Sequence, residues 1–205
     1  MTTQIQRRRG TTSQHSSFTG ALGELTVDTD KDTVVVHDGS TAGGIPLMRE
    51  DGNNAWDAQN NTRLGGNAGD SFDGTNAVDN TLIGYNAGTA ITTGDDNVAV
   101  GSGALKTNTT ADNNTAIGKD ALEDNTGGWN TAVGAYSLAN NTTGFDNTGV
   151  GYTALVTNTT GQDNVAVGTK SLYSNTTADY NTAVGMKSLF TNTTGSENTA
   201  VGKEA

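Results

Sequence analysis

The amino-acid sequence predicts an all-β protein, in which a small N-terminal β-domain precedes a parallel β-solenoid (a β-roll) of 16–17-residue repeats. Three observations support this prediction. A five-residue word that begins with Asn recurs at nearly constant intervals, and residues within the word alternate between β-branched and small. The composition, with 32% apolar residues, 28 Gly and a single Pro in 205 residues, is also too poor in apolar side chains for a compact globule.

The first segment, residues 1–49, is expected to be an N-terminal attachment β-domain. Leu25 and Val27 alternate with polar residues, residues 29–32 have turn composition, and residues 33–37 are rich in β-branched side chains, which together predict a β-hairpin. Residues 7–9 are three consecutive arginines. We interpret this basic cluster as a solvated strand end or a subunit contact.

The second segment, residues 50–79, is rich in Asn, Asp and Gly, with Trp56 and Phe72 as isolated aromatic anchors. We interpret it as a transition or collar. It contains a degenerate form of the repeated word that begins at Asn61, 19 residues before the first regular copy.

The third segment, residues 80–205, carries the regular repeat. Its word begins at Asn80, Asn97, Asn114, Asn130, Asn147, Asn164, Asn181 and Asn198, so that all spacings are 17 residues except one of 16. Self-similarity at such a period is the sequence signature of a solenoid. We therefore expect seven full repeats and a partial eighth, stacked about 4.8 Å apart.

Within each repeat the sequence predicts two short strands and two turns. In the first strand Thr115 and Ile117 share one face and Ala116 lies on the other. The second strand is expected around a recurrent Leu, and Asn-Thr-Thr-Gly has turn chemistry. The candidate structural positions are Asn114, Asn130, the Val/Ile column of Ile117, Val133, Val167 and Val184, the glycines Gly118 and Gly134, and the Leu column of Leu122, Leu138, Leu172 and Leu189.

The recurrent Val or Ile and the recurrent Leu are expected to stack into a thin core. The Asn that opens each repeat either pairs with its neighbours along the stack or holds its own turn, and the turn role is slightly favoured. Because so little apolar surface is available per repeat, one coil stack alone is expected to be marginally stable. The Ala face of the first strand is small enough for other chains to approach, so we expect association through that face.

Several function classes are excluded by composition. The formal net charge of −11 argues against a nucleic-acid partner, and the chain has no run of about 18 apolar residues that would insert in a membrane. Cysteine is absent, and His15 and His37 have no third ligand nearby, so we expect neither a metal site nor a cofactor. Residues 28–32 imitate the start of a calcium loop, but Gly39 stands where a bidentate Glu is needed. Without a catalytic motif, we expect no enzymatic activity.

The repeat, with words such as NTAVG and SLxxNTTG, resembles the head repeats of trimeric autotransporter adhesins, and more closely the arrays of tail-fibre-like proteins. The repeats here are longer than those of the adhesins. The first fifty residues are similar to the N-terminal domain of the phage major tropism determinant family, in the words QIQRRRG from Gln4, GELTVDTDKDTVVVHDG from Gly23, and TAGGIPL ending at Leu47. These resemblances imply a β-domain that trimerises at the end of a receptor-binding protein, and a homotrimer.

The leading functional hypothesis is a structural virion protein, a bacteriophage tail fibre. Its N-terminal domain would dock on tail or baseplate proteins, and its shaft would project a distal tip toward a host cell-surface receptor, with the fibre continuing beyond Ala205. A bacterial trimeric cell-surface adhesin is the alternative, against which the absence of a signal peptide at the start counts. An ice-binding β-solenoid and an enzymatic tailspike are weaker alternatives.

Overall fold

The computed structural model describes residues 8–10, 13, 17, 19, 25–28, 33–36, 45–46, 59–72 and 76–205. The chain divides into two compact units, Met1–Asp57 and Ala58–Ala205. The first contains a four-stranded sheet and the second a nine-stranded sheet. The all-β class predicted from the sequence is confirmed, as is the parallel β-solenoid.

The sheet of the first unit has the strand order β1-β2-β3-β4, with β1 (Arg8–Gly10), β2 (Leu25–Asp28), β3 (Thr33–Val36) and β4 (Ile45–Pro46). Strands β2 and β3 pair antiparallel, from Leu25 opposite Val36 to Asp28 opposite Thr33, which confirms the predicted hairpin. Strand β1 pairs parallel with β2, so Arg8 and Arg9 of the arginine cluster lie in a strand. The predicted turn at residues 29–32, and His15, His37 and Trp56, lie outside the described residues.

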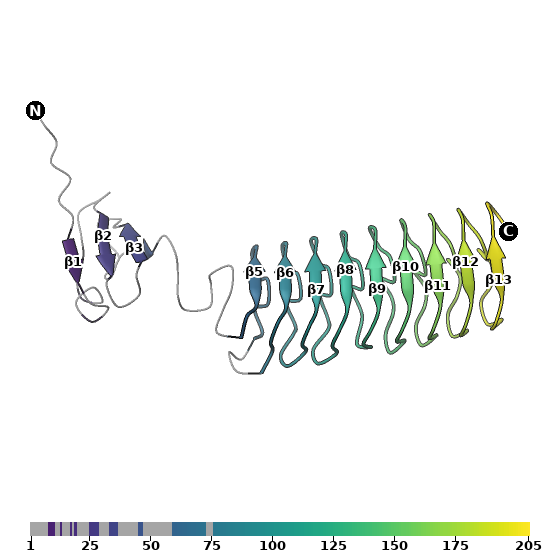
Figure 1. Ribbon diagram of the computed structural model, residues 1–205, viewed down its shortest axis with the longest axis horizontal. Coiled ribbons are helices and arrows are strands. Elements are labelled where there is room, and N and C mark those ends of the chain that lie inside the picture. The colour runs from purple at the N-terminus through teal and green to yellow at the C-terminus, as the bar shows by residue number, and fades with distance from the viewer. Residues whose placement is uncertain are drawn as a thin grey trace, which may run out of the picture. The chain divides into compact units, whose positions relative to one another are not determined.

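The second unit is a parallel β-solenoid in which every coil contributes one three-residue strand to a single sheet (Figure 1). Its strands are stacked in chain order, and each pairs in register with the same repeat position of the next, as Ala116 does with Ala132. The strands are β5 (Thr62–Leu64), β6 (Thr81–Ile83), β7 (Val98–Val100), β8 (Thr115–Ile117), β9 (Thr131–Val133), β10 (Thr148–Val150), β11 (Val165–Val167), β12 (Thr182–Val184) and β13 (Thr199–Val201).

The degenerate word at Asn61 forms the first coil of the stack. Strand β5 pairs parallel with β6, with Arg63 opposite Leu82, so the sheet begins one coil earlier than the boundary predicted at residue 80. Arg63 occupies the position that holds buried residues in the next strands. Its guanidinium lies 5.3 Å from the Phe72 ring centroid and donates a 3.3 Å hydrogen bond to the Gly69 carbonyl. A polar side chain therefore covers this end of the core, as is usual for the terminal coil of a solenoid.

The segment around the recurrent Leu is a turn, so the second predicted strand is wrong. Leu105, Leu122, Leu138, Leu155, Leu172 and Leu189 have φ between 47° and 54°. This is the left-handed region, whereas a strand needs a negative φ. A Leu in that region costs about 1–2 kcal/mol, but the conformation turns the side chain into the coil, where Leu155 is fully buried.

The strand buries the face that was predicted to lie outside and exposes the face that was predicted to form the core. The central Ala residues, such as Ala116 and Ala132, are fully buried, whereas Ile117 is 40% exposed. The expectation that Ile117, Val133, Val167 and Val184 form the core was therefore wrong; they belong to the outer face, as the strand burial patterns show.

The narrowness of the coil explains this arrangement. At Gly149, which replaces the central Ala in β10, an added Cβ would lie 3.3 Å from Leu138 Cδ1 and 2.6 Å from Ser137 Oγ. The opposite side of the coil thus reaches almost to the strand, and only a small side chain fits between them. A buried Ala face cannot serve as the contact surface between chains that the sequence led us to expect.

Candidate functional site

The Asn that opens each coil forms a continuous buried ladder. Each backbone N–H in this column donates to the side-chain Oδ1 of the Asn one coil earlier, at 2.8–3.1 Å, from Asn80 through Asn114 and Asn130 to Asn198. The side-chain Nδ2 also donates across its own coil, as in Asn147 Nδ2 to the Gly161 carbonyl at 2.8 Å. The column therefore pairs along the stack and also closes each coil. The sequence leaves pairing and holding the turn as alternatives, and the structure shows both.

A second Asn ladder was missed at the sequence level. It comprises Asn108, Asn125, Asn141, Asn158, Asn175 and Asn192. From Asn141 onward each Nδ2 lies 2.7–3.4 Å from the Oδ1 of the preceding member. The two columns converge on shared carbonyls, since Gly144 O accepts from Asn130 Nδ2 at 2.9 Å and from Asn141 Nδ2 at 2.8 Å. The signal that could have found it is the regular Asn-Thr-Thr spacing, which we interpreted only as turn chemistry.

A column of glycines allows the coils to stack closely at the end of each strand. Gly118 and Gly134 have φ of 136° and 129°, and a Cβ at either position would lie 2.6 Å from backbone atoms of the next coil. Any larger residue would both strain the backbone and push two coils apart.

The Leu column supplies most of the apolar core. Leu122, Leu138 and Leu172 are fully buried, and Leu189, in the last turn before the end of the stack, packs against the same cluster.

Replacing Leu155 by Ala is expected to lower the free energy of unfolding by about 2–5 kcal/mol, because it removes a fully buried side chain from a narrow core that cannot collapse. The half-buried neighbour Val156 provides the control, with a Val156→Ala cost below about 1 kcal/mol. Chemical denaturation followed by circular dichroism measures both. Equal costs would show that the Leu column is not the core.

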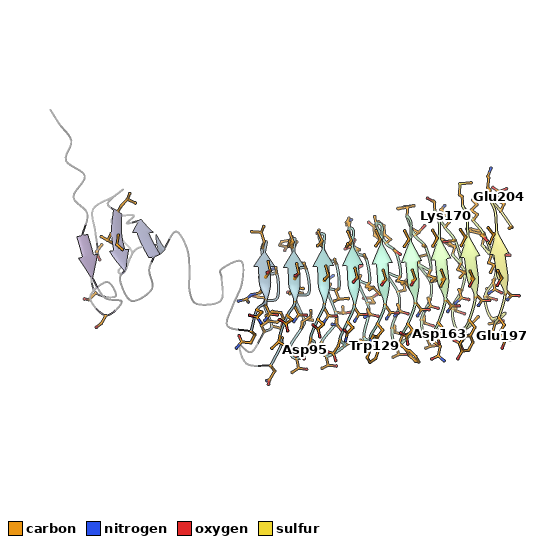
Figure 2. The ribbon with its side chains drawn as sticks, in the orientation of Figure 1. Asp95, Trp129, Asp163, Lys170, Glu197 and Glu204 are labelled. Atoms are coloured by element: carbon orange, nitrogen blue, oxygen red, sulfur yellow. The ribbon has the colours of Figure 1, made fainter. Side chains whose placement is uncertain are left out.

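Charged side chains are segregated to the two edges of the sheet (Figure 2). We call the residues just before each strand-opening Asn the entry edge; it carries Asp79, Asp95, Asp96, Asp112, Asp146, Asp163, Asp179 and Glu197. We call the segment after each strand the exit edge; it carries all lysines of the second unit, Lys106, Lys119, Lys170, Lys187 and Lys203, together with the carboxylates of Asp70, Asp120, Glu123, Asp124 and Glu204. Figure 2 shows Asp95, Asp163 and Glu197 along one side of the ladder of strands and Lys170 along the other.

The lysines of the exit edge pair with acidic and aromatic side chains of neighbouring turns. A hydrogen bond of 3.0 Å to Glu123 raises the pKa of Lys106, and a 2.8 Å hydrogen bond to the Tyr136 hydroxyl raises the pKa of Lys119. Lys170 and Lys187 lie over the rings of Tyr173 and Phe190, each at 5.8 Å from the ring centroid. These contacts between neighbouring turns hold the exit edge in an ordered arrangement.

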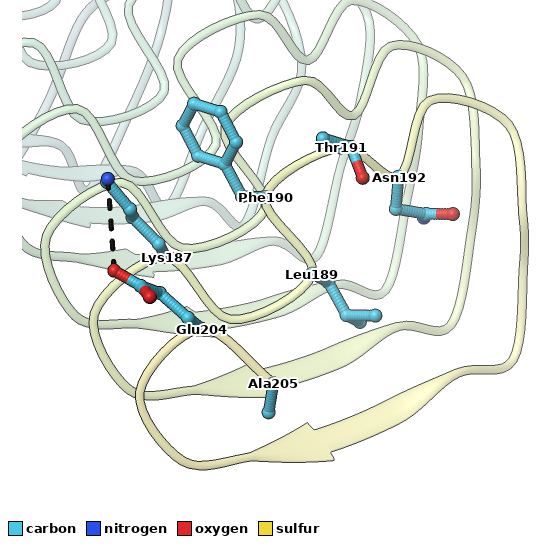
Figure 3. Close-up of a pocket in the computed structure, with 7 residues that line it drawn as sticks. All are labelled: Lys187, Leu189, Phe190, Thr191, Asn192, Glu204 and Ala205. Atoms are coloured by element: carbon cyan, nitrogen blue, oxygen red, sulfur yellow. Dashed lines mark ion pairs between the residues drawn. The ribbon is translucent and has the colours of Figure 1, made fainter.

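The last coil leaves a hollow at the end of the stack (Figure 3). It lies between the turn of Phe190, Thr191 and Asn192 and the final residues Glu204 and Ala205, and Lys187 Nζ approaches Glu204 Oε1 to 3.9 Å.

Other kinds of site were sought within the described part of the chain. No group of three or more His, Cys, Asp or Glu side chains there is placed to hold a metal ion. Nor does that part contain a helix long and apolar enough to cross a membrane.

Comparison with known proteins gives matches to the N-terminal part of the chain. Residues 5–41 match the family model of the major tropism determinant N-terminal domain. A tail fiber receptor-binding protein of Bordetella phage BPP-1 is 69% identical over 51 residues, which are 25% of this chain and 13% of the relative. The chain thus matches only about an eighth of that relative's length.

Solved structures of major tropism determinant variants also match a stretch of the chain. The U1 variant is 73% identical over 22% of this chain and 12% of its own, with a TM-score of 0.20, and the P3c variant is 70% identical over 23% and 12%, with a TM-score of 0.21. At such scores the superpositions say nothing about the fold of the whole chain, and the likeness rests on sequence identity.

Proposed function

We propose that this chain is a structural segment of a bacteriophage tail fibre. Its N-terminal unit attaches the fibre to tail or baseplate proteins, and its solenoid forms a shaft that projects toward the host. The observation that carries the proposal is the 69% identity to a phage tail fiber receptor-binding protein over 51 residues, together with the match of residues 5–41 to the major tropism determinant N-terminal domain. A shared terminal domain on an otherwise different chain is what a common attachment point would produce.

The solenoid is suited to a shaft. Its backbone groups are paired from coil to coil, and both buried Asn columns are engaged in hydrogen bonds that run along the stack. Because each coil contacts only its neighbours, its stability grows with the number of coils. Such a stack provides length and stiffness.

The proposed partners follow from this role. The chain forms a homotrimer in the virion, docks on tail proteins through its first unit, and takes neither a cofactor nor a nucleic-acid partner. We further propose that it is not an enzyme, because its buried polar side chains in the solenoid are mainly asparagines engaged in structural ladders. The comparisons favour a tail fibre over the bacterial adhesin and the ice-binding solenoid.

Immunogold electron microscopy of intact virions, with an antibody raised against residues 58–205, tests the proposal. We expect gold particles on fibres that extend from the tail. Labelling of the bacterial surface with unlabelled virions would instead indicate an adhesin, and would overturn the assignment.

A further inference from the structure

The outer face of the solenoid sheet is uncharged along its whole length, with a continuous apolar row at the third strand positions and mostly Thr at the first. We define this outer sheet face as the first and third residues of strands β5 to β13, all of which are Thr, Val, Ile or Leu. Ile117 and Val165 in the middle of the stack are 40% and 36% exposed. The chain as a whole carries a net charge of −11, so a strip without charge that runs through nine strands is a marked exception. Apolar strips of this kind mark interaction surfaces.

Opposite charges border the part of this strip between residues 130 and 197. Between residues 130 and 197 the entry edge carries Asp146, Asp163, Asp179 and Glu197 and no base, whereas the exit edge carries Lys170 and Lys187 and no carboxylate. A parallel second copy whose entry edge meets the exit edge of the first therefore brings carboxylates to lysines. Two copies that met through the same edge would instead bring like charges together, which is unfavourable.

We propose that copies of this chain associate in parallel around an axis along the shaft, with their outer sheet faces turned toward the axis and the exit edge of each chain against the entry edge of the next. This inference rests on the homotrimer of the proposed function and specifies its interface.

The geometry of the stack indicates that a second copy of this chain covers the outer sheet face. A partner that uses the whole strip must repeat its contacts at the coil spacing of about 4.8 Å, remain uncharged over that length, and present base on one border and acid on the other. This chain meets the first two conditions along the whole strip and the third between residues 130 and 197. Because the contact joins two different edges, rotation about the axis closes a ring, which is the usual route to a cyclic oligomer.

Cysteine cross-linking in the full-length chain tests the interface, because the natural sequence contains no cysteine. Thr148→Cys and Val150→Cys place single thiols on the outer sheet face, and Thr160→Cys places one on an exposed turn of the same coil as the matched control. We expect at least one of the first two variants to form disulfide-linked dimers about tenfold or more faster than the control, since neighbouring chains hold the thiols at high effective concentration. Equal rates in an intact oligomer would overturn the proposed face.

Charge reversal tests the edges. Lys170→Glu with Lys187→Glu is expected to slow cross-linking of the faster reporter severalfold, and adding Asp146→Lys with Asp163→Lys should restore it. Failure of this rescue would contradict the edge pairing. Light scattering on the wild-type chain distinguishes the homotrimer from the interface proposed for it. A monomer would contradict both. A trimer whose outer sheet face gives no faster cross-linking than the control would contradict the interface alone.

Discussion

Replacing Gly151 by Ala is expected to lower the melting temperature by about 10 °C, one of the two largest effects among the substitutions considered. Gly151 has a φ of 139°, and a Cβ there would lie 2.6 Å from the backbone carbonyl carbon of Gly168 in the next coil. Backbone strain and overpacking together cost about 3–5 kcal/mol. The coils cannot separate locally, because β10 and β11 are hydrogen-bonded immediately before this residue.

The adjacent Tyr152 provides the control for this substitution. Its side chain is 51% exposed, so Tyr152→Ala is expected to change the melting temperature by only a few degrees. Thermal denaturation followed by far-ultraviolet circular dichroism measures both variants. If Gly151→Ala melts within a few degrees of the wild type, the close stacking of the glycine column is incorrect.

Replacing Asn147 by Ala is the second large effect, with an expected loss of about 3–5 kcal/mol of unfolding free energy. Asn147 is fully buried. Its Oδ1 accepts from the backbone N–H of Asn164 at 3.1 Å, and its Nδ2 lies 3.2 Å from Asn130 Oδ1 and 2.8 Å from the Gly161 carbonyl. The substitution leaves several buried polar groups without partners, and each costs about 1–3 kcal/mol. Denaturant unfolding measures the loss, with the exposed Asn140→Ala as control.

An Asn147→Asp variant adds a pH test of the same ladder. The carboxylate keeps the acceptor for Asn164 but faces the Gly161 carbonyl without a proton to donate. Burial and this repulsion raise the pKa of the new carboxyl in the folded state above its unfolded value. The unfolding free energy of the variant relative to wild type should therefore fall as pH rises from about 4. A pH-independent difference would contradict the buried ladder.

The periodicity of the sequence was sufficient to predict the stack. Spacing of the Asn words fixes which residues lie above one another, because a parallel in-register sheet repeats each position in every coil, as Thr148 lies opposite Val165. The copy at Asn61 was harder to assign, since its spacing of 19 residues departs from the regular repeat although its strand pairs in register with the next.

The sequence alone could not show which face of each strand is buried. Alternation in Thr115-Ala116-Ile117 has the same period whichever face is buried, and the larger apolar residue is ordinarily the buried one. What decides the question is the width of the coil, which depends on how far Leu from the other side reaches. The distance between the strand and the opposite Leu turn depends on the tertiary structure of the stack, so no local sequence pattern indicates it.

The turn at the recurrent Leu could not be predicted from local sequence either. An apolar Leu flanked by small residues is typical of a strand, and Leu rarely takes a left-handed φ. Here Leu122 has a φ of 52° because the coil must turn back within a few residues and bury its one large side chain. Likewise, Asn141 has local turn chemistry, and its bond to Asn125 exists only once the coils are stacked.

The central claim of this account is that the chain is a tail-fibre segment held to the tail by its N-terminal unit. Quantitative mass spectrometry of purified virions tests it most directly, by comparing the full chain with a variant that lacks residues 5–41, both produced at equal levels. We predict that the full chain is present in particles and that the variant is reduced by about tenfold or more, as expected for the loss of at least ~1.4 kcal/mol of binding. Equal incorporation of the two forms, or absence of the full chain from the particles, would contradict the claim.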